Sequence, residues 1–179
     1  MRLLIVPILL AVALALPSVR LDNLLPDDRG QGALDRNDVR RLEEQLRGGM
    51  DANAVDSIGL TPLMAAAQLG RAEISRVLIR HGANVTARSV LGLTPLAYAA
   101  CSGDAETVVL LLEQGADPNA VDESGNTPLI WAAQSGNADK VWALLAAGAD
   151  PRPANHSGWT AVDAARAYGH PDVAKLLAR

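Results

Sequence analysis

The chain has 179 residues, of which 49% are hydrophobic and 20% charged, so it is long enough to form one globular domain with a buried core. Its formal net charge of −4, with 16 basic residues scattered along the chain, argues against a nucleic-acid backbone as the main partner, because phosphate binding needs clustered Lys and Arg. Aromatic residues make up only 3% and Phe is absent, so Ala, Leu, Val and Ile must fill the core, which favours small, closely packed helices.

The first 18 residues have the composition of a secretory signal peptide. Arg2 is followed by an apolar run over residues 3–16, and the Ala-Leu-Ala at 13–15 offers the small-x-small pattern that signal peptidase accepts. The run is shorter than the roughly 20 residues that a membrane-spanning helix needs, and there is no Cys nearby for a lipid anchor. We therefore expect cleavage near Ala15 to Ser18 and a periplasmic or secreted product, with no stable membrane anchor and a net charge of −5 because Arg2 is lost.

Two segments precede the regular part of the chain. Residues 19–32 carry Pro26, Gly30 and Gly32 among acidic residues and predict a poorly ordered segment. Residues 38–47 then predict an amphipathic helix with Val39, Leu42 and Leu46 on its apolar face.

The rest of the chain repeats with a period of 33 residues. Thr-Pro-Leu begins at Thr61, Thr94 and Thr127, and Thr160 begins a fourth, altered copy; Gly-Ala recurs at 82, 115 and 148, and a single Gly at 70, 103, 136 and 169. Three registers with one period indicate a tandem structural unit.

The first full unit shows what each copy should form. Thr61 can cap a helix and Pro62 suits its first position, so a helix should run from Pro62 to Gly70. A second helix is expected from Glu73 to His81, and residues 84–92 should form a turn that leads to the next Thr-Pro. One such pair cannot bury its apolar face alone, whereas stacked pairs share a continuous core.

The period and the Thr-Pro-Leu and Gly-Ala motifs resemble the ankyrin-repeat family over residues 33–179. The resemblance implies an all-α solenoid of stacked helix-turn-helix units with projecting β-turn loops. The expected units are a half repeat at 33–55, full repeats at 56–88, 89–121 and 122–154, and a C-terminal capping repeat at 155–179. Where the family usually has His after Thr-Pro-Leu, this chain has Met64, Ala97, Ile130 and Asp163, so the hydrogen bonds of that His between units should be missing.

Residues that could carry chemistry are few and dispersed. His81 and His170 fall at helix ends, where a polar surface residue is expected, and His156 falls in a projecting loop, where it is either a contact or a plain surface residue. Cys101, the single cysteine, excludes an intramolecular disulfide and is read as a packing or contact residue, with a redox-sensitive thiol as the alternative. No phosphate-binding or nucleophile motif occurs, so we expect no enzyme activity, cofactor or metal.

In the family, partners commonly lie along a concave groove formed by loop tips and inner helices. Five apolar residues fall on two adjacent tips, and contiguous exposed apolar surface marks interaction sites; the alternative is that these side chains fold back on neighbouring tips. Carried onto matching positions, the expected partner-binding residues are Ile58, Leu60, Gln68, Leu69, Val90, Leu91, Leu93, Cys101, Ser102, Asn126, Gln134, Trp159 and Tyr168.

The large side chains elsewhere have two possible roles. Val109 and Trp142 on the outer helices form either a second, convex contact patch or a cover over aliphatic groups, and Tyr98 and Trp131 are expected to pack in the core or the groove floor. The sequence thus predicts a monomeric protein-binding module of an exported compartment. Two narrower hypotheses are an inhibitor or immunity protein that blocks an envelope enzyme and an accessory protein that stabilises one. The rival hypothesis is a weak hydrolase or redox protein that uses Cys101 or His156.

Overall fold

The computed structural model describes residues 38–178. The predicted signal peptide and the segment predicted to be poorly ordered, residues 1–18 and 19–32, lie outside these described residues. Within residues 38–178 the regular structure is entirely helical, which confirms the predicted fold class. The helices are α2 (Val39–Arg47), α3 (Pro62–Gln68), α4 (Ala72–Arg80), α5 (Pro95–Ser102), α6 (Ala105–Glu113), α7 (Pro128–Ser135), α8 (Ala138–Ala146), α9 (Ala161–Ala167) and α10 (Pro171–Leu177).

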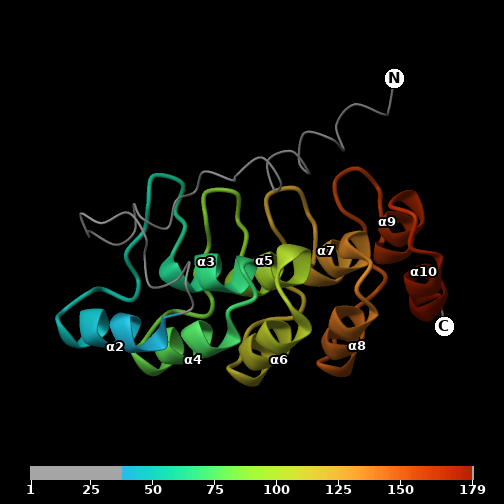
Figure 1. The fold of residues 1–179 in the computed structure, drawn as a ribbon. Coiled ribbons are helices and arrows are strands. Elements are labelled where there is room, and N and C mark those ends of the chain that lie inside the picture. Colours follow the sequence, from blue (N-terminus) through green and yellow to red (C-terminus); the bar gives the residue numbers. More distant parts are fainter. Residues whose placement is uncertain (1–37, 179) are drawn as a thin grey trace.

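These helices form two parallel rows (Figure 1). The inner row is α3, α5, α7 and α9, each packed against the next, and the outer row is α2, α4, α6, α8 and α10. Each inner helix also contacts the outer helix that follows it in the chain. The loops that connect one unit to the next project beyond the inner row (Figure 1), so the molecule is a short solenoid with the loops on its inner-helix side.

Every inner helix begins at a threonine whose hydroxyl accepts a hydrogen bond from the backbone N–H three residues later. The hydroxyl-to-nitrogen distances are 3.2 Å at Thr61, 3.2 Å at Thr94, 3.3 Å at Thr127 and 3.3 Å at Thr160. Proline occupies the first position of α3, α5 and α7, where its missing N–H costs no hydrogen bond. The caps therefore explain why each inner helix begins where the sequence predicted.

The residues that replace the family's histidine take on local roles instead. Asp163 accepts hydrogen bonds from the backbone N–H and the hydroxyl of Thr160, which completes a capping box at the start of α9. Met64 and Ile130 are fully buried and add to the core.

The glycines between paired helices serve two geometric needs. Gly70 and Gly136 have φ values of 63° and 71°, in the left-handed region that favours glycine. Gly103 has φ −75° instead, and there a Cβ would collide with the carbonyl oxygen of Ala67 in the preceding unit. Gly169 also has a left-handed φ, of 80°, so the repeated glycine serves backbone conformation in three units and close helix approach in the other.

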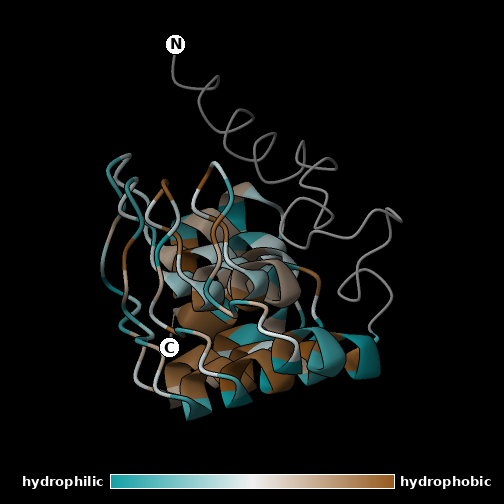
Figure 2. Ribbon diagram, turned by 90° about the vertical axis from the view of Figure 1, so that its left-hand side faces the viewer, coloured by the Kyte–Doolittle hydropathy of each residue, from teal (hydrophilic) through white to brown (hydrophobic). Residues whose placement is uncertain are grey.

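The core runs continuously between the two rows. Small residues dominate the inner helices and leucine and valine dominate the inward faces of the outer helices, so the rows approach closely. Figure 2, viewed from the α2 end, shows hydrophobic residues in brown concentrated in the helices and hydrophilic residues in teal at helix ends and in parts of the loops. The fully buried side chains include Leu42, Leu63, Ile74, Leu78, Leu96, Leu111, Leu129 and Ile130.

Asparagine side chains connect two of the turns between units. The Asn53 amide donates to the carbonyl of Gly82 at 2.9 Å and accepts from the backbone N–H of Asn84 at 2.7 Å. Asn119 makes the same pair of bonds, to Gly148 at 3.1 Å and from Asp150 at 2.8 Å. Each asparagine therefore ties its own unit to the next one.

Candidate partner-binding surface

An aspartate or asparagine fixes the shape of three of the projecting loops. The Oδ1 atom of Asp56 accepts from the backbone N–H groups of Ile58 and Leu60, each at 2.9 Å. Asp122 and Asn155 make the corresponding pairs of bonds in later units. Because these side chains bond backbone N–H groups of their own loop, each loop is held in a defined conformation.

Neighbouring tips are also joined to one another through the backbone. The N–H of Val90 donates to the carbonyl of Ile58 at 3.0 Å, and the N–H of Glu123 donates to the carbonyl of Leu91 at 3.1 Å. His156 donates in the same way to Ser124 at 3.0 Å. The four tips consequently form one continuous ridge along the side of the solenoid (Figure 1).

Three large apolar side chains are exposed on the first two of these tips. Ile58 is 37% exposed, Val90 69% and Leu91 45%, and we call these three residues the apolar tip patch. The next tips carry Glu123 and Ser124, then His156 and Ser157, so the patch occupies only the end of the ridge nearer α2. An exposed group of this kind is typical of an interaction surface.

The prediction that Leu60 and Asn126 are available to a partner was wrong, whereas that for Leu93 stays a prediction. Leu60 is 2% exposed and Asn126 4%, and Leu93 is partly buried against the core. Each of these residues follows the glycine of its turn and directly precedes the capping threonine, so its side chain lies at the foot of the loop and packs inward. Trp159 has the same position in the last unit and is likewise partly buried against the core.

A buried polar network explains Asn126 and Trp131. Asp122 accepts from the indole Nε1 of Trp131 at 3.0 Å and from the side-chain amide of Asn126 at 3.2 Å. The Oδ1 atom of Asn126 in turn accepts from the amide of Asn155 at 2.7 Å. The expected core position of Trp131 is confirmed, and so is that of Tyr98, which is also buried. Polar residues at both ends of the turn, Asp122 and Asn126, were the sequence signal for this network.

The second part of the predicted site lies at the carboxyl ends of the inner helices. Its side chains are uncharged and exposed to different degrees: Leu69, Ser102 and Ser135 are exposed, and the others are half-buried. We call these residues, together with the neighbouring Ser135, the inner-helix floor; it consists of Gln68, Leu69, Cys101, Ser102, Gln134, Ser135 and Tyr168. Floor and tips lie on the same side of the solenoid (Figure 1), although contact of either with a partner stays a prediction.

Cys101 lies in this floor as a poor nucleophile. Burial is the main influence on the thiol and raises its pKa, against the smaller lowering effects of Ser102 and Lys140. Lys140 is only 2% exposed; its Nζ donates to the carbonyl of Gly103 at 3.3 Å, and burial lowers its pKa although Cys101 and Asp104 act in the opposite direction. The sequence missed Lys140 because it lies far from Cys101 in the chain.

The three histidines do not converge. His81 is exposed at the end of α4, and His156 lies on a tip beside Gly125. The ring of His170 covers Gly136, and its Nε2 lies 3.0 Å from the carbonyl oxygen of Gln134. Across residues 38–178, no three His, Cys, Asp or Glu side chains are grouped closely enough to hold a metal ion.

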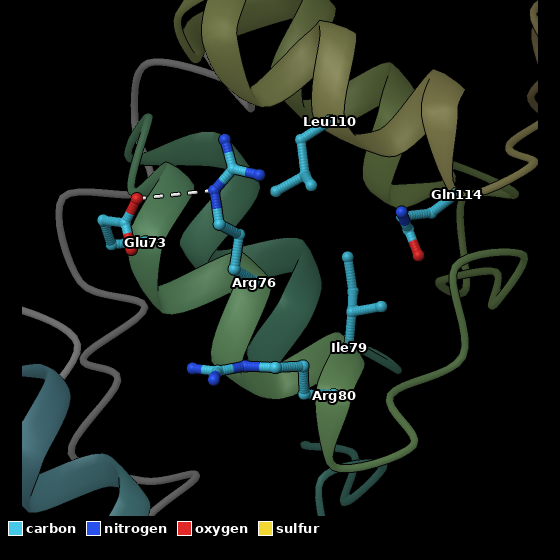
Figure 3. A pocket seen from close by; sticks show the side chains of 6 residues that line it. All are labelled: Glu73, Arg76, Ile79, Arg80, Leu110 and Gln114. Carbon is cyan, nitrogen blue, oxygen red and sulfur yellow. Dashed lines mark ion pairs between the residues drawn. The ribbon is translucent and has the colours of Figure 1, made fainter.

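Two large exposed hydrophobic residues and a shallow pocket lie on the outer helices of the described chain. Val109 and Trp142 are exposed on α6 and α8. The pocket, of about 360 Å³, lies between α4 and α6 and is lined by Glu73, Arg76, Ile79, Arg80, Leu110 and Gln114 (Figure 3). Its arginines are already paired: Arg76 with Glu73 and Glu106, and Arg80 with Glu43. The pocket therefore offers little free positive charge to an anionic ligand.

None of the helices in the part of the chain that the structure describes is long and apolar enough to cross a membrane.

Comparison with known proteins agrees with this architecture. A family model of ankyrin repeats, in three copies, matches residues 32–122 and 106–179. The 2-5A-dependent ribonuclease of Mus musculus is 46% identical over 52 residues, which make up 28% of this chain. The aligned segment is only 7% of the ribonuclease, so the similarity concerns the repeats and not that protein as a whole.

Proposed function

Because the chain belongs to the ankyrin-repeat family, whose repeats serve as protein-protein interaction modules, we propose that it holds a protein partner against the apolar tip patch and the inner-helix floor. The partner's binding is proposed to occur outside the cytoplasm, in the periplasm or another exported compartment.

The observation that carries this proposal is the exposure of Ile58, Val90 and Leu91 on adjacent, hydrogen-bonded tips. Burying a fully exposed aliphatic side chain contributes about 1.5–3 kcal/mol, and these three, already partly buried, would each add roughly half of that to an interface. The tips are held by backbone and aspartate hydrogen bonds, so little conformational entropy is lost when a partner binds.

The proposed compartment rests on the amino-terminal sequence. Arg2, the apolar run and the small residues before Ser18 are typical of a segment that directs export and is then removed. The chain does not depend on a disulfide for its stability, since Cys101 is its single cysteine. An oxidising compartment would therefore not change the stability of the fold through an intramolecular disulfide.

Binding is favoured over catalysis. The rival hypothesis needs Cys101 or His156 as a reactive group, but burial raises the pKa of Cys101 and so keeps the thiol protonated. His156 lies on a tip, in a unit distant in sequence from Cys101. The repeats themselves are typically non-catalytic.

Capture of a partner from an envelope extract tests the proposal. The bait would be the exported chain beside the variant Ile58→Ser/Val90→Ser/Leu91→Ser, and beside the control Val109→Ser/Trp142→Ser, which removes exposed apolar groups from the outer helices. We expect the native chain and the control to capture one protein and the tip variant to lose it by at least tenfold, with unchanged helicity by circular dichroism.

Equal capture by the tip variant would show that the apolar tip patch is not the site. Loss in the control alone would place binding on the outer helices. The identity of the captured protein would separate an inhibitor or immunity role, where it is an enzyme that loses activity in the complex, from an accessory role, where it is an enzyme that needs the complex.

A further inference from the structure

Most of the exposed large hydrophobic side chains in the described chain lie toward one end of the solenoid, the others being Val109, Val121 and Trp142. Ile58, Leu69, Val90 and Leu91 belong to the loops and the first inner helix end of the first two full units, and Val55 directly precedes the first of them. The described chain begins at the same end, where Asp38 caps α2 next to the first unit (Figure 1). The residues that precede Asp38 are therefore joined to the molecule at the end of the solenoid that carries these side chains.

The sequence that precedes Asp38 contains an apolar group suited to such a surface. Leu21, Leu24 and Leu25 have the spacing i, i+3, i+4, which places side chains on one face of a helical turn, and Pro26 follows directly. Short segments with this spacing are a common way to fill an apolar surface between helices or loops. Residues 27–37 carry only Ala33 and Leu34 as further aliphatic side chains, so the leucine triad is the main apolar feature next to the solenoid.

The connection is long enough for the triad to reach the tips. Leu25 and Asp38 are 13 residues apart, which spans at most about 45 Å when extended and roughly 20 Å on average for a flexible chain. Adjacent helices pack about 8–10 Å apart, so the first two units lie within about 30 Å of α2. A tether of this length gives an effective concentration in the millimolar range, at which even a weak contact is largely formed.

We propose that residues 19–26 bind in cis to the apolar tip patch and Leu69 through Leu21, Leu24 and Leu25, and that a protein partner must displace them. The displacement rests on the proposed function; the intramolecular binding does not. Covering the patch in this way also keeps a contiguous apolar surface out of water while the chain has no partner.

Disulfide trapping tests the intramolecular contact in the exported chain, once mass spectrometry has shown that its amino terminus precedes residue 19. In a Cys101→Ser background, Asn23→Cys would be combined with Val90→Cys on the tip, or with Val109→Cys on the outer face as the control. We expect the tip pair to form an intramolecular disulfide at least tenfold faster than the control pair, at a rate independent of protein concentration.

Three outcomes would overturn the contact: equal rates for the two pairs, disulfide-linked dimers in place of monomers, or an exported chain that begins after Leu25. Dimers would show that a second copy occupies the patch. A second measurement uses methyl NMR of Ile58, Val90 and Leu91, whose signals should move in Leu21→Asp/Leu24→Asp/Leu25→Asp. They should stay in place in Gly30→Asp/Gln31→Asp/Gly32→Asp, which adds the same charge outside the triad; equal shifts in both variants would also overturn the contact.

The displacement is tested with the captured partner. If the segment covers the patch nine-tenths of the time, the triple leucine variant should bind the partner about tenfold more tightly than the native chain. If the triple leucine variant binds the partner with unchanged affinity, the partner does not displace residues 19–26. The disulfide-trapping result would then decide separately whether these residues contact the patch. If no partner is captured by any chain, the proposed function fails and the trapping result again decides the contact alone.

Discussion

Single residues in this solenoid are understood best by comparing positions one period apart. Ile74, Thr107, Lys140 and Val173 occupy the same inward position of four outer helices, and all four are buried. Lys140 is the only one of the four with a charged side chain. Its ammonium group loses most of its hydration and gains one hydrogen bond, to the carbonyl of Gly103 at 3.3 Å. Burial lowers its pKa from the ordinary 10.5, so the folded state disfavours the charged form.

Lys140→Met should therefore stabilise the protein by about 1–2 kcal/mol at pH 7, since an apolar side chain of similar length avoids the desolvation cost. The folded pKa lies below the unfolded one, so the native chain becomes more stable as the pH rises between the two values. The advantage of the variant should consequently shrink toward pH 10.5. Urea unfolding of both chains at pH 7 and pH 10 measures this. A less stable variant at pH 7 would show that the hydrogen bond to Gly103 outweighs desolvation.

At the scale of the element, helix ends and turns depend on bonds that are local in sequence. Thr61, Thr94, Thr127 and Thr160 each cap the helix that follows within three residues, and this is why the inner helices were predictable. The connections between units are different, because Asn119 reaches the turn of the next unit, about 30 residues on. Thr86 occupies the corresponding position one unit earlier, and its side chain bonds Asn84 within its own turn.

Asn119→Ala should lower the free energy of unfolding by about 1–2 kcal/mol, because the carbonyl of Gly148 and the N–H of Asp150 each lose a partner. Thr86→Ala is the matched control and should cost only a few tenths of a kcal/mol. Chemical unfolding monitored by circular dichroism compares the two. Equal losses would mean that the bonds of Asn119 contribute nothing beyond those within a single turn.

For the molecule as a whole, contacts run between neighbouring units, so stability should be unevenly distributed along the row. α5 and α7 have inner helices on both sides, whereas α10 is at the end of the row and its first turn lacks a side-chain cap. We expect amide hydrogen exchange to be slowest in α5 and α7 and fastest in α10. Uniform protection across the described helices would indicate that the solenoid opens as a single unit.

The sequence predicted the repeating helices well and the site only in part, and the same physics explains both. Period, caps and glycines act within a few residues, so they can be read along the chain. Which loop side chains point outward depends on their exact place in the turn: Leu60 directly precedes its capping threonine and packs into the core, whereas Leu91 lies at the tip and stays exposed. The network of Asp122, Asn126 and Asn155 joins two units, so the sequence of one unit could not predict it.

Backbone bonds join the tips, from Val90 to Ile58, from Glu123 to Leu91 and from His156 to Ser124. Together with the side chains of Asp56, Asp122 and Asn155, which fix the loops, these bonds set the shape of the ridge independently of the side chains displayed at its tips. Substitutions at the tips are free to accumulate without loss of the fold, so specificity can drift in evolution while architecture is conserved. The same property makes residues 57–58, 90–91, 123–124 and 156–157 suitable positions for randomised libraries, in which new ligands are selected against an unchanged scaffold.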